Sequence, residues 1–262
     1  MDYFAVKKTV AIIQARMSST RLPGKVIKPI GGIPAILLMI RRLQLAKNID
    51  HILVATSLDK SDDELAKILE SFGFNCYRGD LGDVLARFYN AAKAYHADIV
   101  VRITGDCPLV DSTIVDKVVS KLIESRSDYA TNTLPPTYPD GLDVEAFTFE
   151  ALESAYMQAK LTSEREHVTP FIRNHPELFK IVNIEGDRDL SHLRWTVDYL
   201  DDYHFINRLI ELVDIEDVTK ASWLDFHRTI ETHAELSMQN LHRRNEGYEL
   251  SLNQDSKVKS LK

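Results

Sequence analysis

The sequence predicts an α/β protein whose central sheet is mostly parallel and carries helices on both faces. Short apolar runs, typical of buried strands, alternate with segments whose apolar residues recur at helical spacing. This alternation indicates strand–helix–strand units with right-handed crossovers, in which ligands gather at the carboxyl ends of the strands. The length of 262 residues, of which 44% are hydrophobic and 27% charged, is sufficient for one substantial core.

Each element follows from a local pattern. The first strand is the apolar run that ends at Ile13, and the next helix has Ile36, Ile40 and Leu43 at helical spacing, with Pro34 in its first turn. Strands are expected at residues 9–13, 51–56, 75–77, 98–103, 180–184 and 193–197. Helices are expected at residues 33–47, 62–72, 83–95, 111–124, 150–160, 164–174 and 202–213, with a last helical stretch at 219–240.

Two helix starts carry capping signals. Ser163 is expected to cap the helix that begins at Glu164, with Glu166 completing a capping box. Asp201 and Asp202 are expected to cap the helix from residue 202, because negative charge is favourable at the positive end of the helix dipole.

The composition argues against several classes of protein. A formal net charge of −7 argues against general nucleic-acid binding, which requires a basic surface. No segment reaches the roughly 18 apolar residues of a membrane span. Cys76 and Cys107 lack metal-ligand spacing and a disulfide pattern, so a reducing cytoplasm is expected. Residues 1–242 are expected to form a single domain, and the polar residues 243–262 a flexible C-terminal tail.

The loop after the first strand is strongly cationic. Arg16, Arg21 and Lys25 alternate with hydroxyl residues such as Ser18, and Gly24 allows the backbone to approach a ligand closely. Charges, hydroxyls and main-chain N–H groups in one loop are suited to a polyphosphate. The alternative is a solvated basic loop, but the position between a strand and a helix favours phosphate binding.

Two carboxylates follow apolar runs. Asp106 comes after the most continuously apolar of the first four strands and Asp198 after the expected strand at residues 193–197. Mg²⁺ is usually bound by one or two carboxylates together with substrate phosphates, so both residues are candidate metal ligands. The alternative for Asp106 is a turn or a cap of the next helix.

Two further groups are candidates for binding the second substrate. Asn132, Asp140 and Asp143 surround a proline-rich loop and are expected to reach acceptor hydroxyls, although Asn and Asp also favour turns. Arg165 and His167 either begin a helix with solvated charges or direct a cation toward a substrate carboxylate. Together these features suggest a nucleoside triphosphate with Mg²⁺, while the Walker loop and the kinase motifs are missing.

Four motifs make a family resemblance specific. Residues 14–25 (QARMSSTRLPGK), 104–109 (TGDCPL), 138–145 (YPDGLDVE) and 165–170 (REHVTP) resemble cytidylyltransferases of the spore-coat polysaccharide type, which are related to acylneuraminate and CMP-Kdo synthetases. The resemblance covers about residues 10–213. It implies a nucleotide-diphospho-sugar-transferase-like fold, CTP and Mg²⁺, and a homodimer. It also implies that a sugar-acid hydroxyl attacks the α-phosphorus of CTP and releases pyrophosphate.

The resemblance also implies roles for individual residues. Catalysis is assigned to Lys25, Arg16 and Arg21, with nucleotide contacts extending to Ala15, Met17 and Ser18, and metal binding to Asp106 and Asp198. Residues 128–184 become an acceptor and dimerisation subregion that holds Asn132, Asp140, Asp143, Arg165 and His167. Arg78, Gly79 and Asp80 follow the third strand and are interpreted as contacts to the base, although a strand-end turn uses the same residue types.

Three alternatives remain open at this point. A glycosyltransferase on a similar sheet would need a metal-binding Asp-x-Asp, for which residues 187–189 are the main candidate. A nucleotidyltransferase with another base or a non-sugar acceptor has the same charge requirements. A nucleotide-binding module without catalysis is the third. The sequence does not identify the acceptor.

Overall fold

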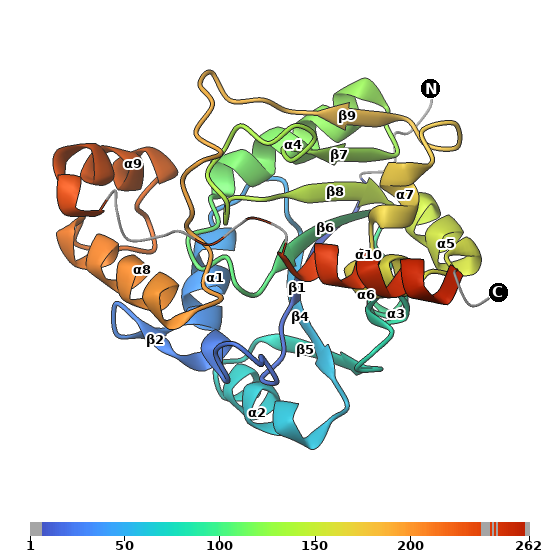
Figure 1. The fold of residues 1–262 in the computed structure, drawn as a ribbon, viewed down its shortest axis with the longest axis horizontal. Coiled ribbons are helices and arrows are strands. Elements are labelled where there is room, and N and C mark those ends of the chain that lie inside the picture. Colours follow the sequence, from blue (N-terminus) through green and yellow to red (C-terminus); the bar gives the residue numbers. More distant parts are fainter. Residues whose placement is uncertain (1–6, 237–241, 243, 245, 260–262) are drawn as a thin grey trace.

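The structure is a computed structural model that describes residues 7–236, 242, 244 and 246–259. Its centre is a seven-stranded sheet with the order β5-β4-β1-β6-β8-β7-β9 (Figure 1). The strands of this sheet are β1 (Thr9–Gln14), β4 (His51–Ser57), β5 (Asn75–Gly79), β6 (Ile99–Thr104), β7 (Tyr129–Thr131), β8 (Glu145–Thr148) and β9 (Ile181–Asn183). A separate ribbon pairs β2 (Pro29–Ile30) with β3 (Ile33–Pro34).

Helices connect and cover these strands. They are α1 (Ala35–Leu43), α2 (Asp63–Ser71), α3 (Val84–Ala94), α4 (Ser112–Ser125), α5 (Phe149–Gln158), α6 (Thr162–His167), α7 (Pro170–Asn174), α8 (Leu200–Leu212), α9 (Trp223–Thr232) and α10 (Glu246–Lys259). Short 3-10 turns lie at Lys25–Ile27, Lys60–Asp62 and Ala234–Leu236. The stretch predicted at 219–240 thus contains α9 and one turn, and residues 237–240 lie outside the described part of the chain.

Strand direction divides the sheet into two parts. β5, β4, β1 and β6 are parallel, whereas β8 is antiparallel to both β6 and β7, and β9 is parallel to β7. In the parallel part Gln14 pairs with Ala55 and with Thr104, so β1, β4 and β6 end at the same edge. The prediction of a mostly parallel α/β sheet is therefore confirmed. This geometry brings the loops after β1 and β6 together.

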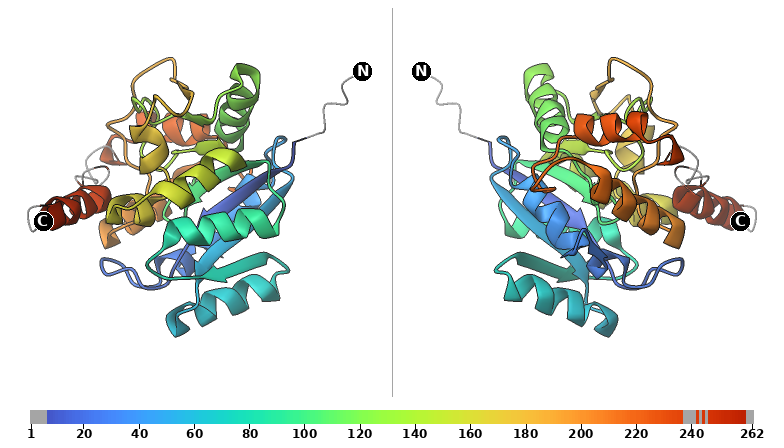
Figure 2. Two further views of the ribbon diagram at one scale, coloured as in Figure 1. Left: turned by 90° about the vertical axis from the view of Figure 1, so that its right-hand side faces the viewer. Right: turned by 90° about the vertical axis from the view of Figure 1, so that its left-hand side faces the viewer.

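Helices cover both faces of the sheet (Figure 2). In β1, Ala11 and Ile13 belong to the core on the side of α1, α4 and α8, whereas Val10 and Ile12 belong to the core on the side of α3 and α5. This division arises because successive side chains of a strand point to opposite faces. All four side chains are fully buried, which explains why this strand is apolar without alternation.

The strand predicted at residues 193–197 was wrong. The segment is hydrogen-bonded to loops and not to the main sheet: Trp195 N donates to Asp140 O at 2.6 Å, and Val197 N donates to Asp106 O at 2.7 Å. Trp195 is fully buried, with its ring edge-on to a phenylalanine of α9. The apolar character of the segment therefore reflects core packing and not sheet pairing.

The single helix predicted over residues 164–174 is two helices. α6 ends at His167, Val168 has a φ of +71°, and α7 begins at Pro170. Proline lacks the backbone N–H and its ring clashes with the preceding turn, so it begins a helix more readily than it continues one. The helix break turns the end of α6 toward the sheet edge described below.

The two capping predictions had different outcomes. Ser163 is not a cap, because α6 begins before it and the Glu164 carboxylate accepts the N–H groups of residues 160 and 161. Asp202, in contrast, accepts the N–H groups of Asp198 and Tyr199 at 2.9 and 3.0 Å and so caps α8 as predicted. In both helices the capping carboxylate therefore stands at the third helical position, Glu164 in α6 and Asp202 in α8.

Within the tail expected at residues 243–262, residues 246–259 form a helix, α10. This helix packs against α6 through Ser251 and Asp255, which are 3% and 6% exposed. Because these buried residues are polar, apolar spacing gave no signal for the helix.

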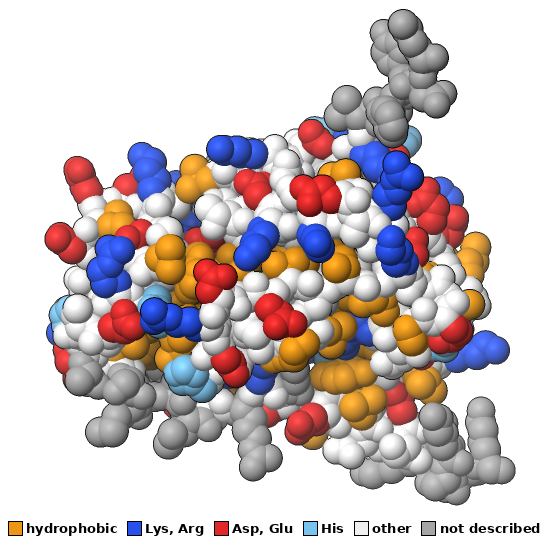
Figure 3. All heavy atoms as spheres, turned by 90° about the horizontal axis from the view of Figure 1, so that it is seen from above, with side chains coloured by type: hydrophobic (Ala, Val, Ile, Leu, Met, Phe, Trp, Pro, Cys, Tyr) orange, Lys and Arg blue, Asp and Glu red, His pale blue; other side chains and the backbone are white. Residues whose placement is uncertain are grey.

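Among the described residues no helix has both the length and the apolar character needed to cross a membrane. Acidic and basic side chains are interspersed on the face in Figure 3.

Candidate active site

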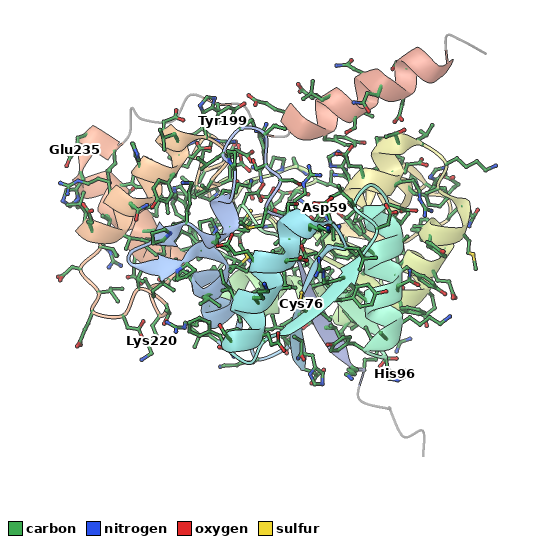
Figure 4. All side chains as sticks on the ribbon, turned by 90° about the horizontal axis from the view of Figure 1, so that it is seen from below. Asp59, Cys76, His96, Tyr199, Lys220 and Glu235 are labelled. Atoms are coloured by element: carbon green, nitrogen blue, oxygen red, sulfur yellow. The ribbon has the colours of Figure 1, made fainter. Side chains whose placement is uncertain are left out.

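A cleft of about 880 Å³ lies at the sheet edge where β1 and β6 end. Its walls are the loops after β1 and β6, the segment before α8, parts of α6 and α7, and the first half of α10. Figure 4 shows Tyr199 and α10 along one edge of the molecule and His96, at the end of α3, at the opposite edge. The cleft is large enough for a nucleotide and a second small substrate.

The cationic loop at residues 15–25 is held in shape by its backbone. Gly24 N donates to Met17 O at 3.0 Å, and Gly24 has a φ of +68°, which favours glycine. Met17 N donates to the carboxylate of Asp62 at 2.7 Å, and the same carboxylate accepts Ser57 N at the end of β4. Burial raises the pKa of Asp62, but these hydrogen bonds outweigh it and keep the pKa below its usual value.

Lys25 brings the loop into contact with both predicted metal ligands. Its Nζ lies 2.7 Å from Asp198 Oδ1 and 3.4 Å from Asp106 Oδ2. Arg21 Nη2 lies 2.8 Å from Asp198 Oδ2. Burial lowers the pKa of Lys25, but the two carboxylates outweigh it and raise the pKa above its usual value. Burial likewise raises the pKa of Asp106, but the Lys25 ammonium and the hydrogen bonds to this carboxylate together outweigh it and hold that pKa well below its usual range.

Asp106 is positioned by close backbone contacts. A Cβ on Gly105 would lie 2.8 Å from Gln14 O, so only glycine lets the β6 loop approach the end of β1 this closely. Asp106 O accepts Val197 N at 2.7 Å and the Thr196 hydroxyl at 3.1 Å. The loop after β6 is thereby fixed to the segment that carries Asp198.

Asp198 is positioned by a buried ion pair next to it. Arg194 Nη2 and Nε lie 3.0 and 3.1 Å from the two oxygens of Asp202, and the Asp202 carboxylate also accepts Asp198 N. Burial lowers the pKa of Arg194, but Asp202 and Asp140 outweigh it and raise the pKa above its usual value. The backbone at Asp198 is therefore fixed without support from a strand.

The predicted acceptor residues Asp140 and Asp143 also line the cleft. Asp140 Oδ2 accepts Arg194 Nη1 at 3.0 Å, and Asp143 pairs with Arg244. Burial raises the pKa of Asp143 to about 7, with Arg244 opposing the shift and Asp140 adding to it. Asp143 is thus poised between its neutral and ionised forms near neutral pH.

His167 lines the cleft, but it is not the cation that the sequence suggested. Burial, together with the charge of Arg102, lowers its pKa to about 4, so the ring is neutral at pH 7. Its Nε2 lies 2.9 Å from the Ser251 hydroxyl of α10. Arg165 is directed elsewhere, to Asp83 and to the backbone oxygen of residue 156.

The structure brings some of the predicted residues to the cleft and leaves others away from it. Those that line it are Ala15, Arg16, Arg21, Lys25, Asp106, Asp140, Asp143, His167 and Asp198. Those that do not are Met17, Ser18, Arg78, Gly79, Asp80, Asn132 and Arg165. Asn132 is fully buried and bonds the backbone of residues 142 and 144, and Arg78 bonds the backbone of residues 57 and 59.

A buried polar cluster at the far end of the cleft was not predicted from the sequence. Arg102 and Arg173 lie around the side chain of Glu145. The Glu145 carboxylate accepts hydrogen bonds from Arg102 Nη1 and from the Tyr129 hydroxyl. It also accepts the Thr169 hydroxyl at 2.6 Å. The charges of Arg102 within β6 and of Glu145 at the start of β8 were the available signal, since charged residues seldom occupy central strands without a partner.

The two carboxylates fit a divalent cation. Within the described residues, clusters of three or more Asp, Glu, His or Cys side chains with metal-binding geometry are absent. Mg²⁺ needs fewer, because substrate phosphates and water complete its shell. That one ammonium group reaches both Asp106 and Asp198 indicates that a single cation can bridge them.

Several proteins are similar in sequence to most of this chain. An uncharacterized protein of Methanocaldococcus jannaschii is 39% identical over 221 residues, which cover 84% of this chain and 90% of the relative. The spore coat polysaccharide biosynthesis protein SpsF of Bacillus subtilis is 34% identical, covering 76% and 85%. A 3-deoxy-manno-octulosonate cytidylyltransferase of Hydrogenovibrio crunogenus is 34% identical, covering 83% and 84%.

Solved structures show the same architecture. A cytidylyltransferase from Leptospira borgpetersenii has a TM-score of 0.85 at 34% identity, covering 91% of this chain and 99% of that one. A CMP-2-keto-3-deoxy-manno-octonic acid synthetase solved with CTP has a TM-score of 0.62 at 18% identity, covering 78% and 98%, and shows the shared fold. The family model for cytidylyltransferases matches residues 10–242. The chain therefore belongs to the cytidylyltransferase family of nucleotidyltransferases.

Proposed function

We propose that the protein transfers CMP from CTP to a sugar acid, with Mg²⁺ and with release of pyrophosphate, in the biosynthesis of a surface polysaccharide or glycoconjugate. The observation that carries the proposal is the contact of Lys25 with Asp106 and Asp198 beside Arg21. Such a centre offers fixed positive charge and two metal-binding carboxylates at one point. Nucleotidyl transfer benefits from this combination because negative charge on the phosphoryl oxygens and on the leaving pyrophosphate must be compensated in the transition state.

The residues of the loop have distinct tasks in this reaction. Arg16 and Arg21 bind the β- and γ-phosphates, and Lys25 neutralises the α-phosphate as it becomes five-coordinate. An acceptor hydroxyl forms a bond to the α-phosphorus while the bond from the α-phosphorus to the bridging oxygen of the pyrophosphate breaks. The hydroxyl passes its proton to solvent water, and pyrophosphate leaves with its charge compensated by the two arginines.

Asp106 and Asp198 would hold Mg²⁺ when the nucleotide is present. The metal supplies additional positive charge to the phosphate oxygens. For this to happen Lys25 must exchange part of its contact with the carboxylates for a contact with phosphate. The side chain of Lys25 is 12% exposed toward the cleft, so the ammonium has access to a ligand there.

The names of the relatives support the choice of substrates. The B. subtilis relative is named for polysaccharide biosynthesis and the H. crunogenus relative for cytidylyl transfer to 3-deoxy-manno-octulosonate. The alternative function as a glycosyltransferase is not supported, because Asp187 and Asp189 of its candidate metal motif are exposed and lie outside the cleft lining. We also propose that the enzyme is cytoplasmic and forms a homodimer; light scattering of the purified protein tests the oligomeric state directly.

The proposed reaction is tested by a pyrophosphate-release assay. CTP, ATP, GTP and UTP are each combined with Mg²⁺ and with 3-deoxy-manno-octulosonate or N-acetylneuraminate as probe acceptors. We expect release with CTP and at least one sugar acid, and its loss when the metal is chelated. Equal release without an acceptor, or release that survives chelation, contradicts the proposal.

A further inference from the structure

Helix α10 forms part of the cleft although it lies beyond the residues that the family model matches. The family model ends at residue 242, whereas α10 begins at Glu246. Tyr248, Ser251 and Gln254 of α10 line the cleft, and their spacing of three residues places them on one side of the helix. One wall of the cleft is therefore formed by residues that follow the part of the chain matched by the family model, which contains the other walls.

The contact of α10 with the rest of the protein is polar. The Ser251 hydroxyl donates to Glu166 Oε2 at 2.8 Å and lies 2.9 Å from His167 Nε2. Asp255, one turn later, accepts the N–H of Ser163 at 3.4 Å. All of these partners belong to α6.

The position of α10 distinguishes the two ends of the cleft. The first residue of α10, Glu246, lies beside the cationic loop at residues 15–25. The Glu246 carboxylate accepts the Tyr199 hydroxyl at 2.7 Å and lies 3.6 Å from Arg21. Tyr248 and Ser251 lie further along, beside α6 and α7. The triphosphate end is therefore bounded by the start of α10, and the far end of the cleft by its next two turns.

Tyr248 forms the centre of the wall at the far end. Its ring lies edge-on to the His167 ring, with centroids 5.2 Å apart, and the Arg173 guanidinium carbon is 5.3 Å from the ring centroid. Arg173 Nε is buried and has no hydrogen-bond partner among the described residues. An aromatic ring beside a cation with an unused donor suits a ligand that has both apolar C–H faces and oxygen acceptors.

We propose that α10 determines which acceptor the enzyme uses, with Tyr248 packing against the ring of a sugar acid at the far end of the cleft. Gln254 extends the same wall with an amide that can bond acceptor hydroxyls. The proposal rests on the proposed cytidylyl transfer to a sugar acid. It adds that the choice among sugar acids depends on residues that follow the part of the chain matched by the family model.

Point variants of the full chain test the proposal. Tyr248→Ala removes the ring, Tyr248→Phe keeps it, and Leu252→Ala is the matched control, because Leu252 is on α10 but is 40% exposed and outside the cleft lining. Initial rates are measured with 3-deoxy-manno-octulosonate or N-acetylneuraminate at saturating CTP, and with CTP at saturating acceptor. We expect Tyr248→Ala to raise the KM for the acceptor about tenfold and to leave the KM for CTP within about twofold.

The expected pattern includes two further results. Tyr248→Phe and Leu252→Ala keep the acceptor KM of the unaltered enzyme. The ratio of kcat/KM values for the two probe acceptors changes in Tyr248→Ala, as it must if the ring contributes to discrimination. An unchanged acceptor KM and an unchanged ratio in Tyr248→Ala overturn the proposal while leaving the proposed reaction intact.

A second measurement needs no turnover. Amide hydrogen exchange across residues 246–256 is followed in the unaltered protein and in Tyr248→Ala, each with and without the two probe sugar acids at millimolar concentration. We expect a sugar acid to slow exchange in the unaltered protein and to have a smaller effect in Tyr248→Ala. Identical exchange with and without both probes overturns the proposal, whereas protection without pyrophosphate release refutes the proposed reaction and retains the role of α10 in binding.

Discussion

At the scale of single residues, the Lys25 ammonium lies between two carboxylates, 2.7 Å from Asp198 and 3.4 Å from Asp106. Lys25→Ala removes this charge from the α-phosphate position and leaves the carboxylates facing each other. We expect pyrophosphate release to fall at least about 100-fold, the range seen when one transition-state donor is removed. Lys60→Ala, an exposed lysine outside the cleft, is the control. Turnover of Lys25→Ala within about twofold of the unaltered enzyme refutes this role.

The carboxyl of Asp143 gives a pH-dependent prediction at the same scale. Burial raises its pKa from 3.8 to about 7, so the native state binds a proton between these values that the unfolded state has released. Stability therefore falls as pH rises through this window. We expect the melting temperature of Asp143→Asn to decline less between pH 5 and pH 8 than that of the unaltered protein. Parallel melting curves for the two proteins across this range contradict the assignment.

At the scale of elements, the turn before α8 depends on one buried carboxylate. Asp202 pairs with Arg194 and accepts the backbone N–H groups of Asp198 and Tyr199. Asp202→Ala leaves the Arg194 guanidinium without its main partner. Breaking a buried pair in this way typically costs about 3–5 kcal/mol, and we expect a loss of this size in the free energy of unfolding.

The neighbouring Asp201 is the matched control for this substitution. It lies in the same first turn of α8, but its side chain is 52% exposed. We expect Asp201→Ala to change the free energy of unfolding by less than about 0.5 kcal/mol in a urea titration. Equal losses in the two variants mean that the buried pair does not fix the turn.

The loop after β6 gives a second prediction about an element. A Cβ at Gly105 would lie 2.8 Å from Gln14 O, so Gly105→Ala must move Asp106 away from Lys25. Gly82→Ala is the control, because the nearest atom to its added Cβ is at 3.6 Å. We expect Gly105→Ala to lower kcat at least tenfold and Gly82→Ala to leave it unchanged. A fully active Gly105→Ala variant argues against a fixed position for Asp106.

The elements also show what could be predicted from sequence. Apolar runs correctly predicted the parallel strands β1, β4 and β6, because most of their side chains on both faces are buried. The same signal failed for residues 193–197, whose apolar side chains pack against helices, and for α10, whose buried residues Ser251 and Asp255 are polar. Periodicity reports burial, and it identifies neither the pairing partner nor a polar interface.

The part of the site that lies at the ends of the parallel strands could be predicted from the sequence. The loop with Lys25 and the loop with Asp106 follow adjacent parallel strands, so their proximity follows from topology. The pair of Arg102 with Glu145 depends on the antiparallel register of β6 and β8, which spacing alone does not give. The position of Arg165 outside the cleft lining could not be predicted, because its partner, Asp83, is distant in sequence.

At the scale of the whole molecule, a ligand that binds only the native state raises stability by mass action. At a concentration of about 100 times its Kd the gain is about 2.7 kcal/mol, and each kcal/mol raises Tm by about 2–4 °C in proteins of about this size. We therefore expect CTP with Mg²⁺ to raise Tm by about 5–10 °C, and the other triphosphates to raise it less. Equal shifts with all four triphosphates contradict recognition of cytosine.

The central claim is that the acceptor attacks the α-phosphorus of CTP in the cleft formed by Lys25, Asp106 and Asp198. The most direct measurement is phosphorus NMR of a mixture of the enzyme, CTP, Mg²⁺ and a sugar acid such as 3-deoxy-manno-octulosonate. We expect the triphosphate signals to be replaced by those of one phosphodiester and of pyrophosphate in equimolar amounts. The appearance of CDP with inorganic phosphate would place the attack at the γ-phosphorus and contradict the claim.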